Sequence, residues 1–146
     1  MGNKLISGNS FVLQTVELLD GRLPLGWEVS SLKPTASSRL AVPVALAVRR
    51  KGTAAAKVRI EAKSSFEPKD VDYLAATLRP TPEQPVLIAA PFLSPRTQER
   101  LRNRGFSSAD LTGNVRLTLT EPGLFIETTG ARENPAPSSR ARKSLK

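Results

Sequence analysis

The chain contains no cysteine and no histidine. Without cysteine it can form neither a disulfide scaffold nor a thiolate metal site, which fits a reducing compartment. Without histidine, a Ser-His-Asp triad, a Cys-His pair and an ordinary zinc site are all excluded. Any catalysis would therefore use carboxylates, lysine, serine, threonine or the one tyrosine, Tyr73.

Long apolar runs are also missing. None approaches the roughly 20 residues that a helix needs to cross a bilayer. Residues 1–9 lack the apolar core of a signal peptide. We therefore expect a cytoplasmic protein that makes no membrane contact.

Positive charge, by contrast, is abundant. The 146 residues suit one domain with a real core. The 22 lysines and arginines outnumber the 13 aspartates and glutamates, giving a net charge of +9. An anionic partner is therefore expected, and nucleic acid is the commonest one for a basic chain. We predict an α/β domain over residues 1–130 and a basic, Pro/Ser-rich disordered tail or linker over 131–146.

Apolar periodicity predicts the order of the secondary-structure elements. The predicted elements are a helix over 11–19 capped by Asn9 or Ser10, strands over 27–32, 40–48 and 57–63, a helix from Pro68, a strand over 86–90, a helix between Ser94 and Gly105, and a hairpin over 115–120 and 124–128. The strand over 86–90 is apolar throughout, which is typical of a parallel strand buried on both faces. The first three strands should form a meander, with Pro43 marking an edge or a bulge.

The strand over residues 57–63 is central to this order. Its apolar residues share one face, and Arg59, Glu61 and Lys63 share the other. Such spacing suits a site in which Glu61 holds a hard divalent cation and Lys63 orients a phosphate or an attacking water. The alternative is a half-buried antiparallel strand with charges on its wet face.

Basic residues also gather on the helix between Ser94 and Gly105, where four arginines surround Leu101. Such a face either contacts phosphates or is simply solvated. The candidate nucleic-acid contacts are Arg96, Arg100 and Arg104 on this helix and Arg140, Arg142 and Lys143 in the tail.

The loop Asp110-Leu-Thr-Gly-Asn has two interpretations. Gly113 and Asn114 readily take positive φ, and the Asp110 side chain can accept hydrogen bonds from backbone N–H groups two residues on. The first interpretation is therefore that the loop is only a turn. The functional alternative is a polar loop at the sheet edge that receives a ligand or a partner chain.

The element order, with Glu61 and Lys63 on the third strand, resembles the PD-(D/E)XK nuclease-like, or restriction-endonuclease-like, fold. The resemblance implies a three-layer α/β (α+β) core with a mixed sheet and a C-terminal hairpin. Residues 86–129 resemble a narrower group, the AbiEi-type antitoxins and related actinobacterial transcriptional regulators. The segments that carry this likeness are Val-Leu-Ile-Ala-Ala-Pro-Phe-Leu-Ser, Arg-Gly-Phe, Asp-Leu-Thr-Gly-Asn and Leu-Phe-Ile-Glu.

By this resemblance Glu61 and Lys63 match the second half of the nuclease motif, and Glu17 matches the first-helix glutamate of some relatives. Glu61 and Glu17 are then the candidate metal ligands. The aspartate that should end the second strand has no counterpart, because Pro43-Val44 stands where Pro-Asp would. Mg²⁺ keeps its waters and binds a lone carboxylate weakly, so this departure weakens the case for cleavage.

Three functions follow from these observations. The first is a DNA-associated regulatory domain of degenerate nuclease fold, non-catalytic and without a cofactor, in a bacterial transcriptional regulator or antitoxin. The second is a Mg²⁺-dependent endonuclease that uses Glu61 and Lys63. The third is a module that binds a toxin or another protein. The sequence does not predict the oligomeric state.

Overall fold

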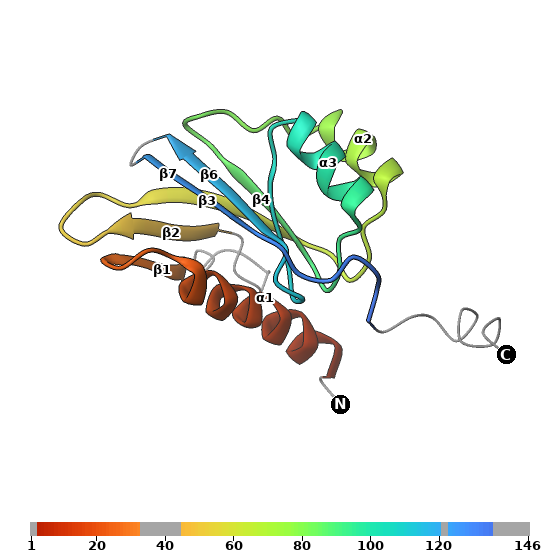
Figure 1. The fold of residues 1–146 in the computed structure, drawn as a ribbon, viewed down its shortest axis with the longest axis horizontal. Coiled ribbons are helices and arrows are strands. Elements are labelled where there is room, and N and C mark those ends of the chain that lie inside the picture. Colours follow the sequence, from red (N-terminus) through yellow and green to blue (C-terminus); the bar gives the residue numbers. More distant parts are fainter. Residues whose placement is uncertain (1–2, 33–44, 121–122, 136–146) are drawn as a thin grey trace, which may run out of the picture.

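The computed structural model describes residues 3–32, 45–120 and 123–135. Within them, three helices accompany a seven-stranded sheet whose strands lie side by side in chain order. Figure 1 shows the sheet curling over α1, with α2 and α3 packed together on the opposite face. The elements are α1 (Asn3–Arg22), β1 (Trp27–Leu32), β2 (Ala45–Arg50), β3 (Ala56–Ala62), α2 (Pro68–Ala75), β4 (Val86–Ala90), α3 (Pro95–Asn103), β5 (Ser107–Asp110), β6 (Val115–Thr120) and β7 (Gly123–Thr128).

The sheet is mixed. Strands β1, β2 and β3 form an antiparallel meander. Strand β4 is parallel to both of its neighbours, β3 and β5. Strands β5, β6 and β7 are again antiparallel. The predicted mixture of α and β structure, the meander and the parallel pairing of β3 with β4 are therefore confirmed.

Alternation along the strands divides the apolar side chains between two cores. The larger core lies between the sheet and α1. Each strand from β2 to β7 contributes buried side chains to it. The smaller core lies beneath α2 and α3 and takes Val86, Ile88 and Ala90 from β4. Because β4 contributes to both cores, all of its residues are buried. We call the α1 side of the sheet its inner face and the α2–α3 side its outer face.

The first helix is longer than predicted. It begins at Asn3, so Asn9 and Ser10 lie within it and the predicted cap at these residues is wrong. Residues 3–10 contain no proline, and a single glycine costs only about 1 kcal/mol in a helix, so nothing in the segment stops it earlier. None of the helices in the described ranges combines the length and apolarity needed to cross a membrane.

Two strands also differ from prediction. The predicted strand over 40–48 is found as β2, which continues to Arg50 because Arg49 and Arg50 pair with β1; residues 40–44, with Pro43, lie outside the described residues. Strand β5 was not predicted, because Ser-Ser-Ala-Asp has no apolar alternation. It is fully buried between β4 and β6, so tertiary packing and not local pattern makes it a strand.

Candidate functional site

Glu61 and Lys63 lie at the end of β3. The register pairs Glu61 with Ile88, which places the Glu61 side chain on the outer face. Its Oε2 accepts a hydrogen bond of 3.0 Å from Arg59 Nε, and Arg59 Nη2 lies 2.9 Å from the same oxygen. Lys63 follows the last residue of β3 and is exposed. The nearest charge to the Glu61 carboxylate is therefore a guanidinium two residues away.

The two predicted metal ligands, Glu61 and Glu17, lie on opposite faces of the sheet. Glu17 is exposed on α1, which packs against the inner face, so the sheet separates it from Glu61. Glu28 accepts a 2.8 Å hydrogen bond from Arg49. In the described ranges, no three acidic side chains gather in a way that could hold a metal ion. The structure does not bring the two predicted metal ligands together.

Asp110, the last residue of β5, is the centre of a closed turn. Its side chain is buried, and five hydrogen bonds reach the carboxylate. Oδ1 accepts from Thr112 N at 2.9 Å, from Thr112 Oγ1 at 2.7 Å and from Asn114 N at 3.1 Å. Oδ2 accepts from Leu93 N at 2.9 Å and from Asn114 Nδ2 at 2.8 Å. Both oxygens are thus fully used within the protein.

The same turn is tied to the chain that follows β7. Asn114 Oδ1 accepts from Gly130 N at 2.7 Å, and Asn114 Nδ2 donates to Ala131 O at 2.8 Å. Gly113 has a φ of +107°, in the region that favours glycine. Gly130 lies so close to Thr112 that a Cβ on it would clash with the Thr112 carbonyl oxygen. These contacts fit the turn interpretation of this loop.

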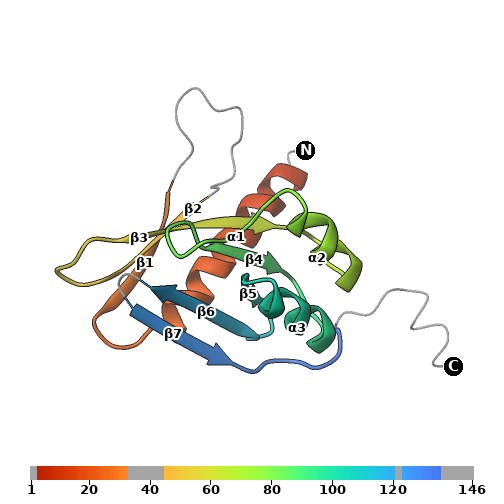
Figure 2. The same ribbon diagram turned by 90° about the horizontal axis from the view of Figure 1, so that it is seen from above.

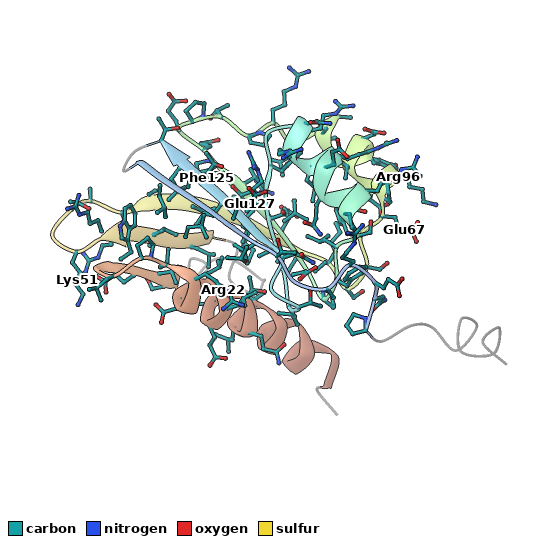
Figure 3. The ribbon with its side chains drawn as sticks, viewed as in Figure 1. Arg22, Lys51, Glu67, Arg96, Phe125 and Glu127 are labelled. Carbon is teal, nitrogen blue, oxygen red and sulfur yellow. The ribbon has the colours of Figure 1, made fainter. Side chains whose placement is uncertain are left out.

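The arginines of the basic helix divide into two sets. Arg100 Nη1 lies 2.7 Å from Asp72 Oδ2, and Arg104 Nη2 lies 3.0 Å from Asp72 Oδ1, so both bind α2. Arg96 and Arg102 have no ion pair within the described residues, and Figure 3 shows Arg96 at the outer surface. The predicted tail contacts, Arg140, Arg142 and Lys143, lie outside the described residues.

A groove of about 460 Å³ lies between β3 and the segment that joins α2 to β4. We call it the β3 groove. It is lined by Ala45, Lys57, Arg59, Leu78, Arg79, Gln84, Pro85 and Val86. Each charged side chain of this lining is a cation.

A second groove, of about 400 Å³, lies between α3 and the outer face of β5, β6 and β7. We call it the α3 groove. Figure 2 shows α3 beside these strands and the chain after β7 passing the end of the helix. Its charged lining mixes both signs and consists of Glu99, Arg102, Arg116, Glu127 and Arg132. Glu127 and Phe125 are labelled on β7 in Figure 3.

Sequence reasoning singled out neither groove, because each joins residues from segments far apart in the chain. Arg102 is one of four arginines around Leu101, and nothing in the sequence separates it from the other three. Comparison of this chain with protein-family models, with curated proteins and with solved structures finds no match.

Proposed function

We propose that this chain is a non-catalytic, DNA-associated domain of degenerate nuclease fold, belonging to a bacterial transcriptional regulator or antitoxin. The observation that carries the proposal is the β3 groove, whose charged lining residues Lys57, Arg59 and Arg79 are all cations. DNA presents a regular array of phosphates, and each cation that approaches one releases counterions and adds affinity. The groove therefore attracts a polyanion such as DNA.

Two of the three cations of the β3 groove are available for phosphates, because the third, Arg59, is paired with Glu61. Lys57 and Arg59 point to the same side of β3, because they are two residues apart on one strand. Lys57 and Arg79 form no ion pair with any residue that the structure describes. The exposed residues Arg50 and Lys51 add positive charge at the tip of the β2–β3 hairpin, where Figure 3 labels Lys51.

The environment of Glu61 supports a domain that holds DNA without cutting it. Metal-assisted hydrolysis of a phosphodiester needs carboxylates that fix the cation and orient its water. Glu61 faces Arg59, Glu17 lies across the sheet, and Asp110 is saturated by five internal hydrogen bonds. The helix–three strands–helix–strand order, with Glu61 and Lys63 at the end of β3, supports descent of the fold from a nuclease.

Fluorescence anisotropy with a labelled DNA duplex over a salt series tests the proposed contact. We expect salt-dependent binding, and we expect Lys57→Gln and Arg79→Gln each to reduce the salt slope by about 1. Lys69→Gln is the matched control, because it removes an exposed lysine from α2 outside the groove. Absence of salt-dependent affinity for the duplex, or an equal loss in Lys69→Gln, would contradict the proposal.

Plasmid nicking in the presence of Mg²⁺ separates this proposal from the endonuclease alternative. We expect no nicking by the wild-type chain. Nicking that disappears in both Glu61→Gln and Lys63→Ala would instead establish the enzyme. If the chain binds no duplex but co-purifies with a neighbouring gene product, the protein-binding module is the correct function.

A further inference from the structure

A buried hydroxyl, that of Ser108, lies at the floor of the α3 groove. Ser108 is 4% exposed, and its Oγ has no partner among the described residues. It pairs in register with Arg116, and the next residue, Ala109, belongs to the inner core, so Ser108 faces outward beneath α3. Buried polar groups are nearly always hydrogen-bonded in native proteins. An atom from outside the chain would supply the missing partner.

Arginines from three separate elements surround this hydroxyl. Arg102 comes from α3, Arg116 from β6 and Arg132 from the chain after β7. Arg102 and Arg132 make no ion pair within the part of the chain that the structure describes. The planar guanidinium presents paired N–H donors that match a carboxylate or a phosphate. The groove can therefore hold an anionic group.

Arg116 is already held in place on the groove floor. Its guanidinium lies 5.1 Å from the centre of the Phe125 ring, and its Nη1 lies 4.0 Å from Glu127 Oε2. Both contacts restrict the rotamers of a long side chain, so less conformational entropy is lost when a ligand binds. Phe125 is otherwise exposed, with 56% of its surface accessible.

The two carboxylates of the groove limit what the anion can be. Glu99 lies on the α3 wall and Glu127 on the β7 floor. A nucleic-acid backbone along the groove would bring phosphates against both of them, which is unfavourable. A small molecule with one anionic group can face the arginines and direct hydroxyl or amino groups to the carboxylates. The volume of about 400 Å³ is in the range of small-molecule sites.

The closed turn at Asp110 holds the far end of the groove. Asn114 binds Gly130 and Ala131 at 2.7 and 2.8 Å, which fixes the chain immediately before Arg132. Thr128 Oγ1 donates to Gly113 O at 2.6 Å on the same segment. The groove is therefore supported on one side by α3 and on the other by a hydrogen-bonded frame, and such rigidity favours specific binding.

From these observations we infer that the α3 groove is a binding site for a small organic molecule carrying one carboxylate or phosphate group. The anionic group lies between Arg102, Arg116 and Arg132, and an oxygen of the ligand bonds the Ser108 hydroxyl. This site is separate from the proposed DNA contact, because the two grooves share no lining residue.

Heteronuclear NMR titration of the full chain tests the inference with phosphoethanolamine, glycerol 3-phosphate and serine as separate probes, each of which carries one anionic group. We expect at least one probe to shift the signals of Ser108 and of the Arg102 side chain. Response to the two phosphates alone identifies a phosphate ligand, and response to serine alone identifies a carboxylate ligand. Ser108→Ala and Arg102→Gln should each lower the affinity for the bound probe by about tenfold.

The matched control is Arg96→Gln, which removes an exposed arginine from the same helix outside the groove. We expect it to leave the affinity for the probe unchanged. The inference is overturned if no probe shifts the groove signals, if Arg96→Gln weakens binding as much as Arg102→Gln does, or if only duplex DNA shifts them. Because Arg102 is exposed, its variant should fold even if the Ser108 variant does not.

Discussion

Replacing Asp110 by alanine should cost the protein a large part of its stability. The substitution deletes five hydrogen bonds. It leaves the main-chain N–H groups of Leu93 and Asn114 without an acceptor, at residues that are 0% and 4% exposed. An unpaired buried donor costs about 1–3 kcal/mol, so these two cost roughly 2–6 kcal/mol together. Relief from burying a carboxylate offsets part of this cost, and we expect a net loss of about 1–4 kcal/mol.

A graded series makes the reasoning specific. Asp110→Asn retains one acceptor oxygen and turns the other position into a donor, so it keeps two or three of the five bonds. We expect roughly half the loss of Asp110→Ala. Asp20→Asn is the control, because Asp20 is exposed on α1 and its side chain makes no hydrogen bond or ion pair with the described residues. Its effect should stay within about 0.5 kcal/mol.

Urea unfolding followed by the fluorescence of the single tryptophan, Trp27, measures all three variants. A loss below about 1 kcal/mol for Asp110→Ala would refute the structural role of the turn. That outcome would return the Asp110 loop to its other interpretation, as a loop that receives a ligand or a partner chain.

Three further substitutions, with one control, test other contacts by the same unfolding assay. Ser108→Ala should raise the free energy of unfolding of the ligand-free protein by about 1 kcal/mol, because it removes an unpaired buried hydroxyl; a clear loss would reveal a hidden partner. Gly130→Ala should cost about 1–3 kcal/mol through its clash with Thr112, whereas Gly21→Ala has open space and should be neutral or stabilising. Asp72→Asn should cost less than about 1 kcal/mol, since its ion pairs are exposed, and a larger cost would contradict this.

Local rules predicted the elements whose signals lie within one segment. Ser94 and Pro95 predicted the start of α3, and Ser94 Oγ does accept a 3.1 Å hydrogen bond from Thr97 N. The apolar run of β4 predicted burial on both faces, because no other environment tolerates five consecutive apolar residues so well. The Asp110 turn was predicted from its own segment, where Asp110 accepts from Thr112 N and Gly113 has a positive φ. The structure does not give Asn114 a positive φ, and its bonds to Gly130 and Ala131 lie outside that segment.

The electrostatics of the candidate site could not be foreseen in the same way. Asp72 and Arg100 are far apart in the chain, and only the packing of α2 against α3 brings them within 2.7 Å. Glu61 is the exception, because Arg59 precedes it by two residues on the same face of one strand. That spacing was a signal of pairing, and it competes with the nuclease interpretation of Glu61. Sequence could locate these charges but could not assign their partners.

The two grooves show why the net charge of a domain is a poor guide to what each of its surfaces binds. Both open on the outer face, one beside β3 and the other beside α3, and each is lined by three cations. The β3 groove has no carboxylate in its described lining, so its field suits a long polyanion. In the α3 groove Glu99 and Glu127 cancel most of the charge of the arginines, and beneath them lies the Ser108 hydroxyl, which has no partner among the residues that the structure describes. Specificity there depends on the placement of single hydrogen-bonding groups, which is how proteins recognise small molecules.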